Sequence, residues 1–232
     1  MINHEFRCLY IHIPKTAGNS INRAFGTGWE DHKDLRRYAA ELTAATFDDY
    51  YKFAIVRNPW DRLFSDYNYQ KVKSRAPESK LFLFKPNGEK RRFREWVEAA
   101  LSDPHRYAPA SWGGEVSPGI HRWSPQVDWI TLDGRVAVDR VLRLENLPKD
   151  FAALGAKLNL PRTTLPRRNR RRHWHYSWYY DDATRDLVGA YYARDIEMFG
   201  YRFEAKTAGL LSVLQACATA FHAMPAATTR AP

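Results

Sequence analysis

Side chains that donate hydrogen bonds are concentrated in one short stretch near the start of the chain. It combines a lysine, hydroxyl and amide side chains with two small residues: Lys15, Thr16, Ala17, Gly18, Asn19 and Ser20. A helix is expected to open at about Gly18, and backbone N–H groups at such a turn hold anions that carry several oxygens. A Walker A loop places its lysine after the glycines, whereas Lys15 precedes Gly18. The stretch therefore predicts a phosphate or sulfate site and disfavours a kinase or NTPase.

A second polar group, Arg57 and Ser65, accompanies the start of another predicted helix. Asn58 is a suitable N-cap residue, and Pro59 suits the first helical position. The predicted helix has an apolar stripe that would face the core. The stripe consists of residues at helical spacing: Trp60, Leu63, Phe64 and Tyr67. Arg57 and Ser65 lie off this stripe and remain available for a ligand.

Both polar groups follow short apolar runs that are typical of buried strands. The first run, Leu9 to Ile13, stops at Pro14, and the second is Lys52 to Val56. Helical spacing within residues 26–51 predicts a short crossover helix between them. A strand–helix–strand connection makes the two strands parallel, so the sequence predicts an α/β fold.

These motifs resemble those of a known family. HIPKTAGNS followed by FAIVRNPWDRLFSDY is similar to the two cofactor signatures of sulfotransferases that use 3′-phosphoadenosine 5′-phosphosulfate (PAPS), in the carbohydrate sulfotransferase (sulfotransferase family 2) branch. The resemblance continues through WSPQVDWI, VDRVLRLENLPKDFAAL and DIEMFGYRF, and it covers roughly residues 8 to 203. It implies a P-loop-like α/β fold of three layers, in which helices flank a central, mostly parallel sheet.

The resemblance also implies a role for each motif. The loop from Lys15 to Ser20 would hold the 5′-phosphosulfate, and Arg57 and Ser65 would hold the 3′-phosphate. Asn169 matches an asparagine of a late loop that closes over the adenosine. By analogy with phosphoryl transfer, Lys15 is placed to stabilise the bridging oxygen while charge develops on the leaving phosphate. No metal is required, and the sequence offers no clustered His, Asp and Glu set to bind one.

A histidine is the first candidate for the base that takes the proton of the acceptor hydroxyl, because its unperturbed pKa lies closest to neutral pH. In the resembling family the usual candidate is a histidine between the two cofactor motifs, and His32 occupies that interval. His121 is the alternative. His12 alternates within the first predicted strand, so we expect it to be packed in the core.

The net charge of +10 indicates an anionic partner. Basic residues concentrate in residues 71–95, a candidate site for an acidic acceptor, and in residues 162–180, where arginines alternate with aromatic rings. Arginines and stacking rings also form nucleic-acid surfaces. We expect a sulfotransferase that acts on a hydroxyl of a carbohydrate or glycan, which the charge suggests to be acidic, with no nucleic-acid partner. A nucleic-acid-binding protein that uses residues 162–180 is the alternative.

The chain is expected to form one domain, residues 1–205, followed by an Ala-rich tail, residues 206–232, that is helical or poorly ordered. The apolar run in the tail is short and interrupted by polar residues, so it does not suit a membrane anchor. No secretory signal precedes the first strand. Cys8 and Cys217 are unsuited to a structural disulfide, which favours a reducing compartment. We expect a cytoplasmic protein.

Three further elements are expected. Asp133-Gly134 predicts a hairpin between Trp129–Leu132 and Arg135–Val138. Residues 141–144 would continue into the central sheet. One helix would run from about residue 182 to residue 199 and end at Gly200, with Leu187, Val188 and Tyr191 on its inner face.

Two charged groups are expected to have structural roles. Asp61 and Arg62 would form an ion pair beside Arg57. Glu145 would cap or brace the helix that starts near Pro148.

Overall fold

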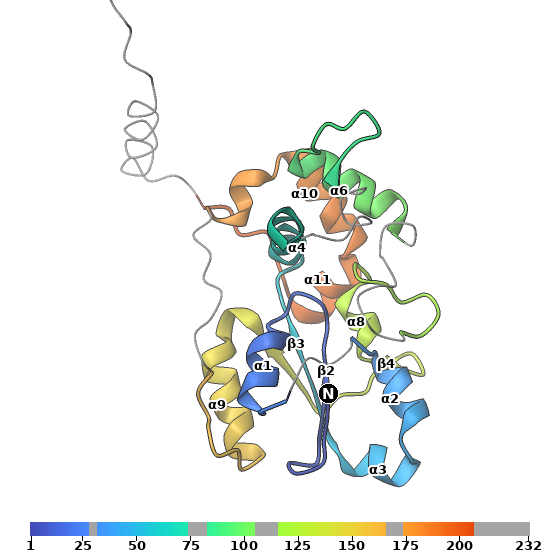
Figure 1. The fold of residues 1–232 in the computed structure, drawn as a ribbon, viewed down its shortest axis with the longest axis vertical. Helices are drawn as coiled ribbons and strands as arrows, with labels where there is room; N and C mark the ends of the chain where they lie inside the picture. The colour runs from blue at the N-terminus through green and yellow to red at the C-terminus, as the bar shows by residue number, and fades with distance from the viewer. Residues whose placement is uncertain (28–31, 74–82, 105–115, 166–173, 207–232) are drawn as a thin grey trace, which may run out of the picture.

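The computed structural model describes residues 1–27, 32–73, 83–104, 116–165 and 174–206 (Figure 1). Asn169, residues 166–173 of the arginine-rich segment and nearly all of the predicted tail lie outside the described residues. Among the helices of the described ranges, none has the length and apolar character that crossing a membrane requires.

A four-stranded sheet forms the centre of the molecule, in the order β1-β2-β3-β6. Its strands are β1 (Ile2–Asn3), β2 (Cys8–Ile11), β3 (Tyr51–Val56) and β6 (Arg140–Arg143). β3 runs parallel to both β2 and β6, whereas the short β1 is antiparallel at the edge. The predicted mostly parallel sheet is therefore confirmed.

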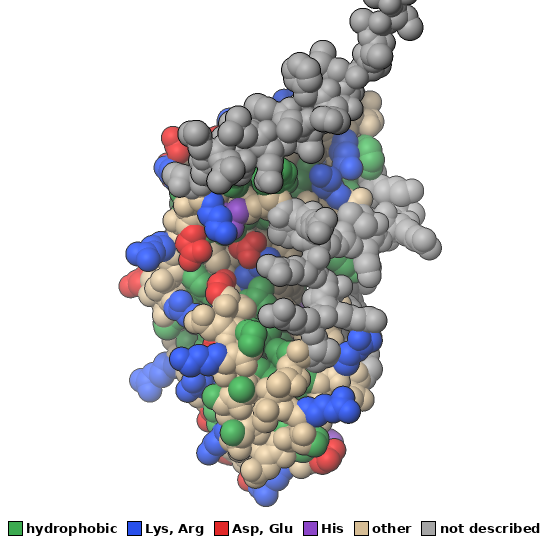
Figure 2. Space-filling model, turned by 90° about the vertical axis from the view of Figure 1, so that its left-hand side faces the viewer, with side chains coloured by type: hydrophobic (Ala, Val, Ile, Leu, Met, Phe, Trp, Pro, Cys, Tyr) green, Lys and Arg blue, Asp and Glu red, His purple; other side chains and the backbone are tan. Residues whose placement is uncertain are grey.

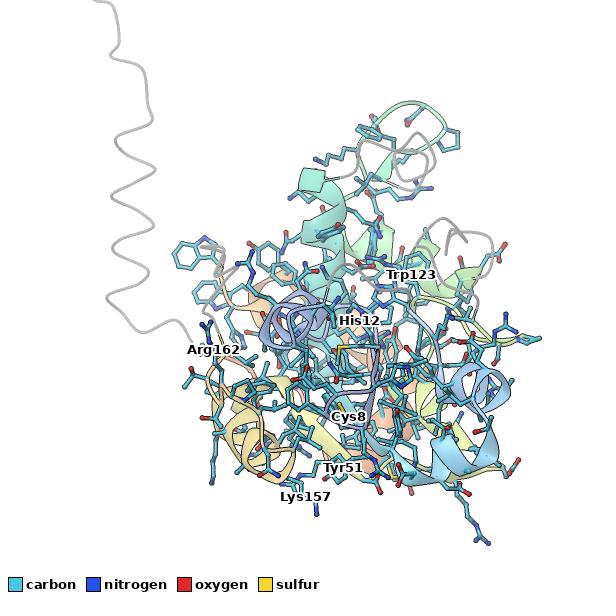
Figure 3. The ribbon with its side chains drawn as sticks, turned by 60° about the horizontal axis from the view of Figure 1, so that its bottom comes forward. Cys8, His12, Tyr51, Trp123, Lys157 and Arg162 are labelled. Carbon is cyan, nitrogen blue, oxygen red and sulfur yellow. The ribbon has the colours of Figure 1, made fainter. Side chains whose placement is uncertain are left out.

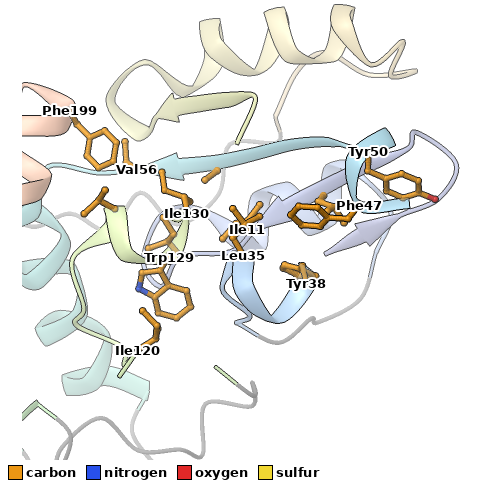
Figure 4. Packing of buried hydrophobic residues seen from close by; sticks show 14 of the residues in the cluster. Ile11, Leu35, Tyr38, Phe47, Tyr50, Val56, Ile120, Trp129, Ile130 and Phe199 are labelled. Atoms are coloured by element: carbon orange, nitrogen blue, oxygen red, sulfur yellow. The ribbon is translucent and has the colours of Figure 1, made fainter. Parts of the chain in front are cut away.

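Helices cover both faces of this sheet and complete the three layers (Figure 1). Side chains of β2 alternate, so Cys8 and Tyr10 belong to one apolar cluster while Leu9 and Ile11 belong to another. The first cluster packs against α1 (Gly18–Ala24) and α9 (Leu147–Lys157). The second packs against α2 (Leu35–Glu41), α3 (Ala44–Asp49) and α8 (Gln126–Trp129) (Figure 4). All four β2 side chains are buried, as expected for a strand covered on both faces.

A third apolar cluster lies beyond the ends of β2 and β3, at the top of Figure 1. It joins α4 (Pro59–Lys73), α6 (Phe93–Ser102), the 3-10 turn η3 (Tyr176–Tyr179) and α10 (Asp182–Tyr191). The predicted stripe of α4 is confirmed, because Trp60, Leu63, Phe64 and Tyr67 are all buried in this cluster. Asn58 accepts a hydrogen bond from the Trp60 N–H at 3.1 Å, which confirms it as the residue that caps α4.

The helix expected between residues 182 and 199 is instead two helices, α10 and α11 (Ala193–Phe199). The break falls at Tyr192, whose ring is fully buried and whose hydroxyl donates to the Trp123 carbonyl at 2.7 Å. Of the residues expected on the inner face, Val188 is buried as predicted, whereas Leu187 is 39% exposed. Gly200 ends α11 with a φ of 62°, as predicted.

The predicted hairpin is present but shorter than expected. β4 (Thr131–Leu132) and β5 (Arg135–Val136) pair around Asp133 and Gly134, which both have positive φ. Trp129 belongs to α8 and not to the first strand. The reason is a tertiary contact, because the buried Asp195 carboxylate accepts the backbone N–H groups of Gln126 and Val127 and so holds this segment as a helical turn.

Candidate active site

The predicted anion loop lies between the end of β2 at Ile11 and the start of α1 at Gly18. Lys15 and Ala17 have φ values of 71° and 81°, so the backbone passes twice through the left-handed region. Thr16 is buried and its hydroxyl donates to the Ile13 carbonyl at 2.8 Å, which ties the loop to the strand it leaves. Successive turns of this kind aim backbone N–H groups at a common point, where an anion binds.

Gly18 lies directly against the imidazole of His12. A Cβ atom at residue 18 would lie 1.7 Å from His12 Nε2, so no other residue fits without displacing that ring. His12 is buried as predicted, and Figure 3 shows it in the interior with Cys8. It forms part of the floor beneath the loop.

Arg57 joins the two predicted anion motifs. Its Nη1 donates to the Lys15 carbonyl at 3.2 Å, and its Nε donates to Asp61 Oδ2 at 2.8 Å. Asp61 thus pairs with Arg57, and the predicted ion pair between Asp61 and Arg62 is wrong. The spacing i, i+4 across the start of α4 brings Asp61 and Arg57 together.

Arg62 is buried and donates to backbone carbonyls from three segments. Its partners are the carbonyls of Pro14 at 3.1 Å, Ser124 at 3.0 Å and Arg122 at 2.8 Å. Arg62 therefore fastens the anion loop to α4 and to the segment before α8.

The side chain of Lys15 extends toward α4. Its Nζ lies 4.0 Å from the ring centroid of Tyr69, within the range of a cation–π contact. Ser65 lies one helical turn before Tyr69, so the predicted 3′-phosphate residue and the ring that contacts Lys15 share one side of α4.

A buried ion pair lies beside this region. Asp66 accepts hydrogen bonds from Arg122 Nε at 2.6 Å and from the indole of Trp123 at 2.9 Å. Burial acts to raise the pKa of Asp66, but the charge and hydrogen bonds of Arg122, helped by Lys15, hold that pKa below its ordinary value. An ionised Asp66 therefore offsets positive charge close to the anion loop.

His32 is 6% exposed and lies against His12, with ring centroids 4.0 Å apart. Its Nδ1 is 2.8 Å from the His12 carbonyl oxygen. A carbonyl only accepts, so Nδ1 carries the hydrogen and Nε2 of the neutral ring holds the lone pair. Burial lowers the pKa of His32 to about 4, against the raising effect of that hydrogen bond.

His121 has the opposite arrangement. Its Nδ1 accepts the Trp123 backbone N–H at 3.2 Å, which leaves the hydrogen of a neutral ring on Nε2. That Nε2 lies 3.4 Å from the Tyr191 hydroxyl.

The sequence was compared with models of protein families. The model of sulfotransferase family 2, described as "Sulfotransferase family", matches residues 1–202. The chain belongs to the sulfotransferase family. Membership supports a transferase that moves sulfuryl groups. Neither a search of curated proteins nor a search of solved structures found a match.

This member of the sulfotransferase family brings most of its predicted site residues together. The loop from Lys15 to Ser20 meets Arg57 directly, whereas Asn169 lies outside the described residues. Glu145 does not brace the helix at Pro148 as predicted, because its Oε1 accepts the Asn58 N–H at 2.7 Å.

Four buried polar residues around the site were missed from the sequence: Asp66, Arg122, Gln126 and Asp195. Their partners are remote in the chain, as for Arg122 and Asp66. The one available signal was the family-like segments that contain Gln126 and Asp195.

Proposed function

We propose that this chain transfers the sulfuryl group of PAPS to a hydroxyl of a carbohydrate or glycan. The hydrogen bond from Arg57 Nη1 to the Lys15 carbonyl carries the proposal, because it joins a 5′-phosphosulfate motif and a 3′-phosphate motif in one site. Family membership supports sulfuryl transfer, and PAPS is the donor that the family implies.

The donor would lie between the anion loop and α4. Lys15, Thr16, Ala17, Gly18, Asn19 and Ser20 would surround the 5′-phosphosulfate. Arg57 and Ser65 would hold the 3′-phosphate, with Asn169 closing over the nucleotide. The close approach of Gly18 to His12 fits this assignment, since it leaves the residue 18 backbone without a side chain that would shield it.

The reaction would break the bond from sulfur to the 5′-phosphate oxygen and form a bond from sulfur to the acceptor oxygen. Lys15 would stabilise the negative charge that develops on the leaving phosphate. The acceptor proton would pass to Nε2 of His32. His32 is chosen over His121 because it lies between the two cofactor motifs, where the resembling family has its usual base candidate, and because its Nδ1 hydrogen bond to the His12 carbonyl fixes the orientation of the ring.

The acceptor class rests on the branch of the family and on the net charge of +10. Figure 2 shows Lys and Arg side chains spread along the height of one face, with Asp and Glu between them. The excess of positive charge would favour an acidic glycan over a neutral one, over distances set by ionic strength.

Calorimetry with 3′-phosphoadenosine 5′-phosphate (PAP), AMP and ATP tests the proposal. We expect the wild type to bind PAP in preference to AMP and ATP. Arg57→Ala should remove this preference, because the guanidinium would supply the charge-assisted contact to the 3′-phosphate. Arg185→Ala is a matched control, since Arg185 also pairs with carboxylates but on α10. It should bind PAP as the wild type does.

Equal affinity of the wild type for PAP and AMP would refute this function. It would favour the nucleic-acid alternative, which predicts binding that weakens steeply with salt and does not depend on Lys15.

A further inference from the structure

The turn between β3 and α4, Arg57-Asn58, is held by side chains from distant parts of the chain. These come from the family-like segments WSPQVDWI, VDRVLRLENLPKDFAAL and DIEMFGYRF. None of these segments supplies a residue that would contact the donor in the site proposed above. Their convergence on one turn suggests a common purpose.

Gln126 binds both backbone groups of Arg57. Its Oε1 accepts the Arg57 N–H at 2.9 Å, and its Nε2 donates to the Arg57 carbonyl at 2.8 Å. Gln126 is fully buried, so water cannot replace either bond in the folded chain. The paired contact fixes the peptide planes on both sides of Arg57.

Asp195 fixes the orientation of Gln126. Its carboxylate accepts the Gln126 backbone N–H at 2.8 Å and the Gln126 side-chain Nε2 at 3.1 Å. Asp195 is itself fully buried in α11. The carboxamide therefore presents its oxygen to the Arg57 N–H and its nitrogen to the Arg57 carbonyl.

Glu145 fixes the next residue. Its Oε1 accepts the Asn58 N–H at 2.7 Å, and its Oε2 accepts the Tyr201 hydroxyl at 3.2 Å. The Asn58 side chain in turn donates to the Arg202 carbonyl at 2.9 Å. The turn is thus held from the 3-10 turn η2 (Leu144–Asn146), which follows β6, and from the chain after α11.

We infer that Gln126, Glu145 and Asp195 are positioning residues for recognition of the 3′-phosphate, and this inference rests on the proposed function. They act through Arg57 by fixing the backbone from which its side chain extends. With Asp61 and the Lys15 carbonyl holding the guanidinium, Arg57 is ordered before the nucleotide arrives. A preorganised arginine loses less conformational entropy on binding. This would strengthen its contact with the 3′-phosphate and so favour PAP over AMP.

The test measures affinity for PAP and for AMP in the full chain with Gln126→Met or Glu145→Ala. In each variant the ratio of the affinity for PAP to the affinity for AMP should fall about tenfold. The affinity for AMP itself should be unchanged, because the 5′ loop is untouched. Glu145→Gln retains an acceptor oxygen for the Asn58 N–H and should keep the preference. Melting curves establish that each variant is folded.

Asp139→Ala is the matched control. Asp139 Oδ2 accepts the Lys52 N–H at 2.6 Å at the opposite end of β3. Its loss should lower the melting temperature without changing the preference for PAP.

A folded Glu145→Ala variant that keeps the full preference would overturn the inference, and so would equal losses of PAP and AMP affinity, which a merely structural role predicts. Because Glu145 is exposed, this variant keeps the test decisive if Gln126→Met fails to fold. A wild type without preference for PAP would instead refute the proposed function, and the inference with it.

Discussion

At the scale of single residues, the anion loop has a backbone that most residues avoid. Lys15 and Ala17 both adopt the left-handed conformation, which costs an L-residue roughly 1–2 kcal/mol. Gly18 must remain a glycine because His12 occupies the space of a side chain. Strain at a ligand loop is retained where the surrounding structure compensates, as Arg62 and Thr16 do through their bonds to loop carbonyls.

Ala17→Gly should relieve part of this strain. Glycine adopts a φ of 81° without a Cβ clash, so we expect the free energy of unfolding to rise by about 1 kcal/mol, less the entropy that glycine adds to the unfolded chain. Urea denaturation measures the change. Affinity for PAP should be unaltered, because Ala17 would contribute through its backbone.

Ala152→Gly provides the opposite control. Ala152 is exposed in the interior of α9, where glycine costs about 1 kcal/mol. If Ala17→Gly destabilised the protein as Ala152→Gly does, the left-handed conformation of Ala17 would be refuted.

His32 should make stability depend on pH. Burial lowers the pKa of His32 from 6.5 to about 4 in the folded protein. Between these values the unfolded chain binds a proton that the folded chain does not. The free energy of unfolding should therefore fall as the pH drops from about 6.5 to about 4, by roughly 3 kcal/mol from this group.

Urea denaturation across this pH range, with His32→Gln, measures the contribution. The free energy of unfolding of the variant should fall less steeply as the pH drops. It should not become independent of pH, since burial also lowers the pKa of His12. A wild-type slope in His32→Gln would show that His32 is not the titrating group.

At the scale of elements, α4 connects the core to the site. One side of the helix packs Trp60, Leu63, Phe64 and Tyr67 into the third cluster. Other positions carry Arg62, Ser65, Asp66 and Tyr69, which reach the loop, the ion pair and the proposed 3′-phosphate site. Any shift of α4 would therefore move both halves of the proposed nucleotide site.

Arg62→Met should show that the candidate site depends on how α4 is fastened to the anion loop. It removes the donors to the carbonyls of Pro14, Arg122 and Ser124, and buried acceptors without partners cost about 1–3 kcal/mol each. We expect a loss of stability of about 3 kcal/mol and weaker binding of both PAP and AMP. Calorimetry and denaturation measure the two effects.

Arg62→Lys should have a stability and affinities for PAP and AMP between those of the wild type and Arg62→Met. A single ammonium cannot reach all three carbonyls in the fork geometry of arginine. Arg185→Met, at a partly exposed arginine of α10, should have little effect. Wild-type stability in Arg62→Met would contradict the role of Arg62 in fastening the loop.

At the scale of the whole molecule, the site lies where the sheet meets the third apolar cluster. β2 and β3 are parallel and in register, with Ile11 beside Ala54, so the segments that follow them leave the same edge of the sheet. Ligands of open α/β sheets bind outside this edge. Parallel topology alone therefore brings Lys15 close to Arg57, although they are far apart in the sequence.

The sequence by itself determined the main strands and helix starts, and it placed the two predicted anion motifs after them. Apolar runs that stop at Pro14 and before Asn58 mark buried strands and helix starts, because short-range sterics and capping are encoded within a few residues. The fold class, the start of α1 at Gly18 and the packed stripe of α4 followed from such local patterns.

Only the tertiary structure decided which polar groups meet. Glu145 accepts the Asn58 N–H, Gln126 binds the backbone of Arg57, and the tautomer of His32 follows from its bond to the His12 carbonyl. All three contacts join residues that are remote in the chain. The break between α10 and α11 also lies at a residue with a remote partner, because the Tyr192 hydroxyl donates to the Trp123 carbonyl. A buried polar group takes whichever partner satisfies it, and the fold, not the neighbouring residues, determines which partner is within reach.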